Sequence, residues 1–240
     1  MALPLFFHSG DLIAGRQVWL VEETARHIVQ VLRMDVGEQF HLTDGKGTAA
    51  TVRIVEAAKK KCLVQVEKVD IHQPSKPALH LAVAFTRNAA RNEWLLEKAT
   101  ELGVATITPI QAIRSIRERS KPERWNNILI SAMLQSQQFY LPVLNEPTTP
   151  GQLVEYAAGL PQKLVAHCMN GEKQHLTVAC KAGLETIILI GPEGDFSNEE
   201  VTLFEANGFT GISLGQRRLR TETAAMSVCS YFNTINNEEA

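Results

Sequence analysis

The sequence predicts an α/β protein in two parts, a small β-rich module followed by a larger domain built around a mostly parallel sheet. Short runs of alternating apolar and polar residues dominate residues 1–72, whereas strand-like and helix-like runs alternate further along the chain. Between the two parts, Gln73-Pro74-Ser75-Lys76-Pro77 combines two prolines with small polar residues, as is typical of a linker. We therefore expect one domain at residues 1–72 and a second at residues 73–240.

The first part is expected to contain four strands, a turn and one helix. The turn is Asp44-Gly45-Lys46-Gly47, and the helix runs from about Glu22 to Met34. The four runs with strand-like alternation are RQVWLV (16–21), EQFHLTD (38–44), TAATVRIVEA (48–57) and KCLVQVEKV (61–69).

The second part is expected to alternate strands with helices, which predicts a parallel sheet covered by helices on both faces. Ser197 and Glu200 form a capping box that starts one of the helices. The expected strands are LHLAVAF (79–85), ATITPI (105–110), KLVAHC (163–168), TIILIG (186–191) and GISLG (211–215). The expected helices span residues 91–103, 125–139, 151–158, 198–207 and 221–235.

Composition excludes several classes of protein. The 240 residues are 45% hydrophobic and 21% charged, which argues against disordered, collagenous and coiled-coil chains. A net charge of −2 argues against a surface coated in positive charge, although a local basic patch can still bind nucleic acid. The four cysteines show no zinc-site spacing, so we expect no metal. Without a signal peptide or a long apolar run, we expect a cytoplasmic protein that does not span a membrane.

Two glycine-bearing loops are the strongest candidates for a binding site. Gly191–Ser197 follows the strand TIILI, and Gly215–Ala224 follows the strand ISL. Ligands of open α/β sheets bind beyond the carboxyl ends of the strands, and glycine lets the backbone approach a flat ligand closely. A nucleotide-like ligand is the natural occupant. The tetrapeptide Gly-Pro-x-Gly is also consistent with a tight turn alone, and neither a Rossmann nor a P-loop motif is present.

Three segments together resemble a known family. They are Trp94–Val104 (WLLEKATELGV), Ile190–Ser197 (IGPEGDFS) and Leu214–Ala224 (LGQRRLRTETA), joined by His27-x-x-x-Val31-Leu32-Arg33 and Asp44-Gly45-x-Gly47 in the first part. In this order they resemble the RsmE family of 16S ribosomal RNA uridine-N3 methyltransferases, within the SPOUT superfamily. The resemblance implies a PUA-like β-barrel that binds RNA, followed by a SPOUT domain with a C-terminal deep trefoil knot.

The same resemblance implies a function and its partners. The expected reaction is S-adenosylmethionine-dependent methylation of N3 of a specific uridine in the 3′ decoding region of 16S ribosomal RNA. The expected partners are 16S ribosomal RNA, in the small ribosomal subunit, and a second copy of the chain in a homodimer. The residues expected to bind S-adenosylmethionine are His167, Leu189, Ile190, Gly191, Pro192, Glu193, Gly194, Leu214, Gly215, Leu219, Arg220 and Thr221.

Arg220 is the expected catalytic residue, by its place in the Leu-Arg-Thr-Glu-Thr-Ala motif, with Glu222 as a second candidate. A guanidinium stays protonated and cannot act as a base, but it can stabilise the uracil anion that forms when N3 loses its proton. The alternative interpretation of Arg220 is a surface arginine paired with Glu222. Glu222 and Glu193 could each position a ribose hydroxyl or cap a helix.

The RNA contacts are expected from local positive charge. The stretch from Arg114 to Arg124 carries five cations against two glutamates, a density that suits contact with phosphates. The residues expected to bind RNA are Arg33, Arg87, Arg91, Arg114, Arg117, Arg119, Gln135 and Ser136.

The sequence departs from the family pattern at several places, one of them Leu5, which stands where an arginine often precedes the aromatic pair Phe6-Phe7. Asp195 stands where glycine is common, Asn88 replaces a glycine after Arg87, and Leu134 begins a segment that is usually Glu-Gln-Ser/Cys-x-Arg. Two other functions stay open. One is a non-catalytic ribosomal RNA-binding or assembly factor with the same fold, and the other is an unrelated nucleotide-dependent α/β enzyme.

Overall fold

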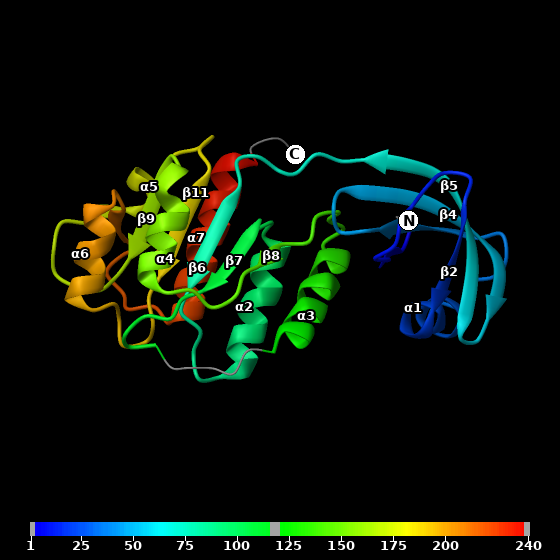
Figure 1. Cartoon of the computed structure of the whole chain (residues 1–240), viewed down its shortest axis with the longest axis horizontal. Helices are drawn as coiled ribbons and strands as arrows, with labels where there is room; N and C mark the ends of the chain where they lie inside the picture. The colour runs from blue at the N-terminus through cyan, green and yellow to red at the C-terminus, as the bar shows by residue number, and fades with distance from the viewer. Residues whose placement is uncertain (1–2, 116–120, 238–240) are drawn as a thin grey trace. The chain divides into compact units, whose positions relative to one another are not determined.

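The computed structural model describes residues 3–115 and 121–237. The chain forms two units, shown in Figure 1. The first comprises Met1–Pro74 together with Met133–Leu141, and the second comprises Ser75–Ala132 and Pro142–Ala240. A division at one point of the sequence, as expected above, does not capture the return of Met133–Leu141 to the first unit.

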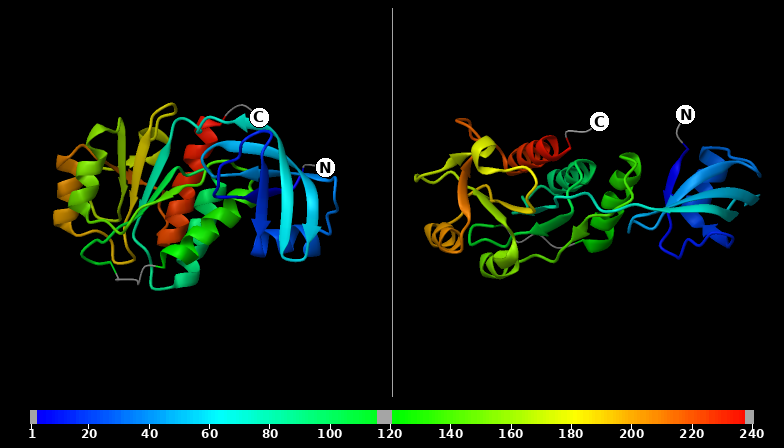
Figure 2. Two further views of the ribbon diagram at one scale, coloured as in Figure 1. Left: turned by 45° about the vertical axis from the view of Figure 1, so that its right-hand side comes forward. Right: turned by 90° about the horizontal axis from the view of Figure 1, so that it is seen from above.

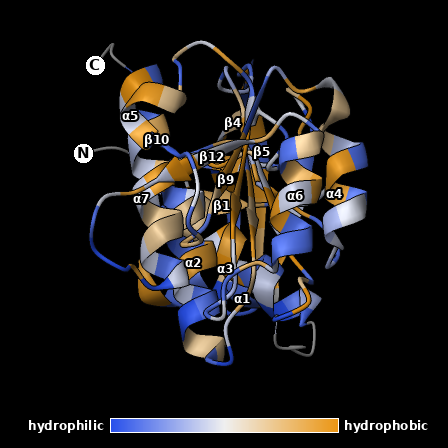
Figure 3. Cartoon of the chain, turned by 90° about the vertical axis from the view of Figure 1, so that its left-hand side faces the viewer, coloured by the Kyte–Doolittle hydropathy of each residue, from blue (hydrophilic) through white to orange (hydrophobic). Residues whose placement is uncertain are grey.

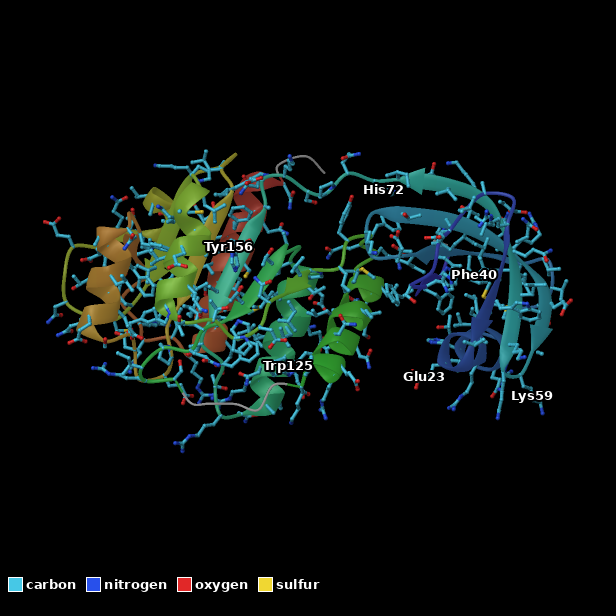
Figure 4. The ribbon with its side chains drawn as sticks, viewed as in Figure 1. Glu23, Phe40, Lys59, His72, Trp125 and Tyr156 are labelled. Atoms are coloured by element: carbon cyan, nitrogen blue, oxygen red, sulfur yellow. The ribbon has the colours of Figure 1, made fainter. Side chains whose placement is uncertain are left out.

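The first unit is built on a five-stranded sheet. Its strand order is β1-β3-β4-β5-β2, with β1 parallel to β3 and the other neighbours antiparallel. The strands are β1 (Leu5–Phe7), β2 (Gln17–Val21), β3 (Gln39–Thr43), β4 (Thr48–Ala58) and β5 (Lys61–Ile71). Lys59, labelled in Figure 4, lies in the turn between the two long strands β4 and β5. Alternate apolar residues of the sheet, Phe40 and Leu42 among them, form the core of this unit.

The helix expected at residues 22–34 is shorter and irregular. α1 (Glu22–Arg26) continues into a π-helical turn at His27–Val31, and Arg33 then adopts a positive φ of 55°. Ile28 is fully buried against the sheet. The apolar pattern therefore identified a helical segment, but its regular part ends earlier than expected.

The segment Met133–Leu141 completes the first unit. Its backbone pairs with the turn at residues 44–47, since the N–H of Gly47 donates to the carbonyl of Phe139 at 2.9 Å and the N–H of Leu141 to that of Gly45 at 2.8 Å. The ring of Phe139 also stacks on His72, with 4.3 Å between ring centroids. The glycine turn therefore binds another stretch of the chain as well as joining two strands.

The second unit contains a seven-stranded sheet in which every neighbouring pair is parallel, as the alternation of strands and helices predicts. Its strand order is β10-β12-β9-β11-β6-β7-β8. The strands are β6 (Leu79–Val83), β7 (Thr106–Pro109), β8 (Val143–Leu144), β9 (Gln162–Ala166), β10 (Gln174–His175), β11 (Thr186–Ile190) and β12 (Thr210–Ser213).

Helices cover both faces of this sheet, with the apolar strands between them (Figure 3). α4 (Pro150–Tyr156) and α6 (Asn198–Ala206) bury Leu153 and Phe204 with Ile187 and Leu189 of β11 on one face. α2 (Ala89–Glu101) and α7 (Thr221–Asn236) pack together on the other, and α7, red in Figure 2, lies against β6 and β11. The remaining helical segments are α3 (Pro122–Gln135), η2 (Ala157–Gly159) and α5 (Leu176–Ala179).

Helix ends account for the differences from the expected bounds. Asn88 caps α2, because its side chain accepts from the N–H groups of Ala90 and Arg91 at 3.0 and 3.3 Å, and the helix starts at Ala89. The expected helix 125–139 instead ends at Gln135, since Gln137 has a positive φ of 56° and the chain turns away. The expected capping box of Ser197 and Glu200 is present at α6.

Candidate functional site

A cavity of about 630 Å³ lies at the carboxyl ends of three adjacent strands of the second unit. In the sheet register, Ala166 at the end of β9 stands opposite Ile190 of β11 on one side and Ile212 of β12 on the other. All three residues line the cavity. The loops that leave these strands form its walls, which is where an open α/β sheet binds its ligand.

Hydrogen bonds join the loops around the cavity. Thr221, the first residue of α7, donates through its Oγ1 to the carbonyl of Gly191 at 3.3 Å, and the guanidinium of Arg218 donates to the carbonyl of Glu193 at 3.3 Å. A Cβ on Gly191 would stand 3.0 Å from the ring of Phe196, so a larger residue would crowd the loop after β11. The two glycine-bearing loops of the sequence therefore form one continuous site.

Most of the residues expected to bind the cofactor lie in this cavity. His167, Ile190, Gly191, Pro192, Glu193, Leu214, Gly215, Leu219, Arg220 and Thr221 line it. Leu189 is fully buried in the core between the sheet, α4 and α6, and Gly194 lies at the surface outside the lining. A strand alternates its faces, so Leu189 points away from the site that Ile190 reaches.

Although the two candidate loops include five of them, other residues that line the cavity were not named individually as cofactor-binding by the sequence analysis. They are Ala166, Cys168, Lys173, Asp195, Ile212, Ser213, Gln216, Arg217, Arg218 and Ala224. The arginines stand inside a motif already quoted, and Ala166 and Ile212 could have been found as residues at or near the ends of strands. Lys173 lies beyond any motif, and only the folded loop brings it to the cavity.

His167 is a buried polar residue of the cavity wall. It is 9% exposed, and neither ring nitrogen has a hydrogen-bond partner among the residues described. Burial, reinforced by the nearby charge of Lys173, holds the pKa of His167 below its usual value. The ring is therefore neutral near pH 7, with one nitrogen able to donate and the other able to accept.

The two candidate catalytic residues differ in their surroundings. Arg220 is exposed, lies at the N-terminal end of α7 and lines the cavity. Glu222 is 8% exposed, and its Oε1 lies 3.5 Å from Arg91 Nε, whereas its Oε2 is buried with no partner in the described structure. Arg91 also lies 3.7 Å from Glu193. Glu222 is thus paired with Arg91 of α2, and no pairing with Arg220 is seen between these described side chains.

The backbone explains the departure at Asp195. Asp195 adopts a positive φ of 63°, the left-handed conformation that glycine adopts most easily and that aspartate tolerates better than most residues. The departure at Asn88 is explained by the cap of α2. Nothing in the structure explains Leu134, which is half-buried near the end of α3.

The residues expected to bind RNA have varied surroundings. Arg33 and Arg87 are exposed, in the first and second unit respectively. Arg114 is exposed, but its guanidinium donates to the carbonyls of Gly194 and Phe196 at 3.0 and 3.3 Å and so supports the loop after β11. Gln135 and Ser136 lie in the segment that belongs to the first unit. Arg117 and Arg119 fall outside the described residues.

The cavity presents charges of both signs. Lys173, Arg217, Arg218 and Arg220 contribute cations, whereas Glu193 and Asp195 contribute carboxylates. Within residues 3–115 and 121–237, no group of three His, Cys, Asp or Glu side chains gathers as a metal site. Over the same ranges, no helix has the length and apolarity to cross a membrane. The cavity is suited to a ligand with an apolar portion and separate charged groups.

Two family models match the chain. An RNA methyltransferase domain matches residues 73–233, and an RNA methyltransferase PUA domain matches residues 21–67. The ribosomal RNA small subunit methyltransferase E of Bacillus subtilis is 30% identical, over 87% of this chain and 88% of its own length.

Two solved structures are similar over nearly the whole chain. The ribosomal RNA small subunit methyltransferase E of Neisseria gonorrhoeae, bound to S-adenosyl methionine, is 28% identical with a TM-score of 0.83, and 98% of each chain is covered. A protein of Legionella pneumophila, solved with the bound cofactor SAM, is 31% identical with a TM-score of 0.86, covering 98% of this chain and 99% of that one.

Proposed function

Because the chain belongs to the ribosomal RNA small subunit methyltransferase E family, we propose that it methylates N3 of one uridine in the 3′ decoding region of 16S ribosomal RNA. The methyl donor is S-adenosylmethionine. The observation that carries the proposal is the cavity at the ends of β9, β11 and β12, lined by the two loops whose motifs point to this family. Its volume of about 630 Å³ is in the range of small-molecule sites.

The residues of the cavity fit the donor. Bound S-adenosylmethionine would supply the methyl group of its sulfonium: the acceptor nitrogen would attack that methyl carbon in line, and the neutral thioether would leave. Ala166, Ile190 and Ile212 offer an apolar wall for a flat base, and His167 also lines the cavity beside them. Gly191 keeps the backbone close enough to line the site. The protein's part in the reaction is to align the two reactants, which removes much of the entropic barrier.

Arg220 stabilises the charge that the acceptor develops. Its guanidinium remains protonated, so it does not take the N3 proton itself, but it favours the uracil anion left behind. Arg220 lines the cavity, and none of the described side chains forms an ion pair with it. Glu222, in the first turn of α7, is the second candidate catalytic residue, and its side chain is paired with Arg91 of α2.

A further set of charged and polar residues binds the RNA. We assign this role to Arg33, Arg87, Arg91, Arg114, Gln135 and Ser136, with Arg117 and Arg119 in the segment outside the described residues. Arg33, Gln135 and Ser136 belong to the first unit, where the PUA model matches part of the chain. The uridine is taken out of its stack to reach the donor, as enzymes that modify a base require.

The proposal includes a deep trefoil knot of the SPOUT type, a homodimer and a cytoplasmic location. Support for the knot comes from α7, which starts beside the loop after β11 through the Thr221–Gly191 hydrogen bond and packs against α2 and the centre of the sheet. Support for the location comes from the substrate, since ribosomal subunits lie in the cytoplasm.

The direct test is methyl transfer from labelled S-adenosylmethionine to small ribosomal subunits that lack the modification, followed by mapping of the labelled nucleotide. We expect label on N3 of a single uridine in the decoding region. Arg220→Ala is expected to keep the fold and lower the rate by about 100-fold or more, because one stabilising group is removed from a developing charge. Arg26→Ala, an exposed arginine of α1, is the matched control and should leave the rate unchanged.

Two outcomes would contradict the proposal. Tight binding of ribosomal RNA without transfer of label would favour the non-catalytic assembly factor. Binding of ATP or NAD in place of S-adenosylmethionine would favour an unrelated nucleotide-dependent enzyme. An unchanged rate for Arg220→Ala would remove Arg220 from the mechanism while leaving the reaction intact.

A further inference from the structure

Asp195 joins two of the loops that wall the cavity. Its Oδ2 accepts from the backbone N–H of Cys168 at 2.8 Å, across 27 residues of sequence. Its Oδ1 accepts from the N–H of Phe196 at 2.9 Å, and its own N–H donates to the carbonyl of Pro192 at 2.8 Å. One side chain therefore fastens the loop after β9 to the loop after β11.

The fastened segment is held from its other side as well. The ammonium of Lys173 donates to the carbonyl of His167 at 3.1 Å and to that of Met169 at 2.8 Å. Two charged side chains therefore hold residues 167–169. The carboxylate of Asp195 accepts from one backbone N–H, and the ammonium of Lys173 donates to two backbone carbonyls. Hydrogen bonds that involve a charged partner are the stronger kind.

His167 is the residue that this arrangement places. Its ring packs closely on β12, because a Cβ added to Gly211 would stand 3.0 Å from His167 Nε2. Both ring nitrogens are buried without a described partner, and the residue lines the cavity. The position of the buried His167 ring therefore depends on its packing and on the backbone of residues 167–169, not on hydrogen bonds of its own.

We propose that Asp195 is a positioning residue that holds residues 167–169, and with them His167, in the wall of the cavity where they contact the bound methyl donor. The proposal rests on the proposed function, since it takes S-adenosylmethionine as the ligand of this cavity. Asp195 acts through the backbone of Cys168 and not through its charge on the donor. Asp195, which stands where glycine is common in the family, therefore organises the donor site of this chain.

The backbone conformation provides a clean variant. Glycine adopts a φ of 63° at least as readily as aspartate, so Asp195→Gly removes the side-chain hydrogen bonds without adding backbone strain. Asparagine also tolerates this conformation, but its amide has one acceptor oxygen where the carboxylate has two, so Asp195→Asn can keep only one of the two hydrogen bonds.

The experiment is calorimetric titration of the full-length protein with S-adenosylmethionine and with S-adenosylhomocysteine, alongside hydrogen exchange at the Cys168 amide. Asp195→Gly is expected to weaken both ligands by about tenfold, which corresponds to the loss of one charge-assisted hydrogen bond. The Cys168 amide should exchange faster while the β11 amides are unchanged. Asp195→Asn should fall between the wild type and Asp195→Gly.

A double-mutant cycle with His167→Ala tests whether Asp195 acts through His167. Asp195→Gly should have almost no further effect on affinity in the His167→Ala protein. Full additivity of the two variants would overturn the proposal, as would a loss confined to the sulfonium ligand, which would indicate direct attraction between Asp195 and that cation. Wild-type affinity in Asp195→Gly would also overturn it. Failure of the wild-type protein to bind S-adenosylmethionine would instead refute the proposed function.

Discussion

Glu222 is a buried carboxylate whose charge is matched by a residue far away in the sequence. Its side chain is 10% exposed, and Arg91, 33% exposed, is the cation within 4.0 Å of it in the described structure. A buried charge that loses its partner destabilises a protein more than the pair stabilises it, because the remaining charge stays desolvated. The Arg91–Glu222 pair therefore ties α2 to the start of α7, beside the cavity.

We predict that Arg91→Ala lowers the free energy of unfolding by about 1–3 kcal/mol, because Glu222 is left buried and unpaired. Adding Glu222→Gln should restore part of this loss, since the neutral amide needs no counter-charge. Urea unfolding of the single and double variants measures both effects. Equal stability of Arg91→Ala and the wild type would mean that the pair does not hold these helices together.

His80 couples two neighbouring strands of the larger sheet. It lies on β6 and is 5% exposed, and its Nε2 shares a hydrogen bond of 2.7 Å with Thr108 of β7. Its ring makes a T-shaped contact with the ring of Tyr156, with 4.8 Å between the centroids. Burial lowers the pKa of His80 from 6.5 to about 4. The unfolded chain therefore binds a proton at a pH where the folded protein does not.

The stability of the protein should consequently fall with pH below about 6.5. The contribution of His80 is complete above its unfolded pKa and decreases as pH falls toward about 4, by about 2 kcal/mol between pH 7 and pH 5. Urea unfolding across this range measures the slope, and His80→Asn should make it shallower. His8 and His167 also have lowered pKa values, so a weaker slope remains in that variant.

Gly47, in the turn between β3 and β4, and Gly15, just before β2, form a matched pair of glycines with positive φ. Gly47 has a φ of 98°, and a Cβ there would overlap the ring of Tyr140. Gly15 has a φ of 82°, with nothing within 4 Å of the added atom. Both substitutions strain the backbone, but only the first also creates an overlap.

Gly15→Ala is expected to destabilise the first unit by about 1 kcal/mol, the cost of a left-handed alanine. Gly47→Ala should cost distinctly more, because the ring of Tyr140 must move and its hydroxyl bond to the His72 carbonyl is disturbed. In a Tyr140→Ala background, Gly47→Ala should cost no more than Gly15→Ala. Thermal unfolding of the wild type and the four variants checks this, and equal midpoints for the two single glycine variants would contradict it.

At the scale of the whole molecule, the first unit includes a segment that follows the first strands of the second unit in the sequence. Phe139 lies between β7 and β8 in the sequence, yet its ring stacks on His72 and its carbonyl accepts from Gly47. The two units are therefore not separable by cutting the chain once.

We expect Phe139→Ala to destabilise the first unit by about 1–2 kcal/mol, because it removes the ring stacked on His72. Hydrogen exchange followed by mass spectrometry should show less protection in β3, β4 and β5 and no change in β9 and β11. Ser131→Ala, an exposed position on α3, is the control. Loss of protection in β9 and β11 alone would contradict the assignment of this segment to the first unit.

The sequence by itself predicted the parallel sheet, the loops that form the cavity and most of its lining, because these follow from local patterns. Strand and helix periods, the Ser197–Glu200 cap and glycines at strand ends are properties of neighbouring residues. It could not predict the bond between Asp195 and Cys168, the pairing of Glu222 with Arg91, or the place of Met133–Leu141 in the first unit. These contacts join residues far apart in the chain, and only the tertiary structure decides which distant groups come within hydrogen-bonding reach.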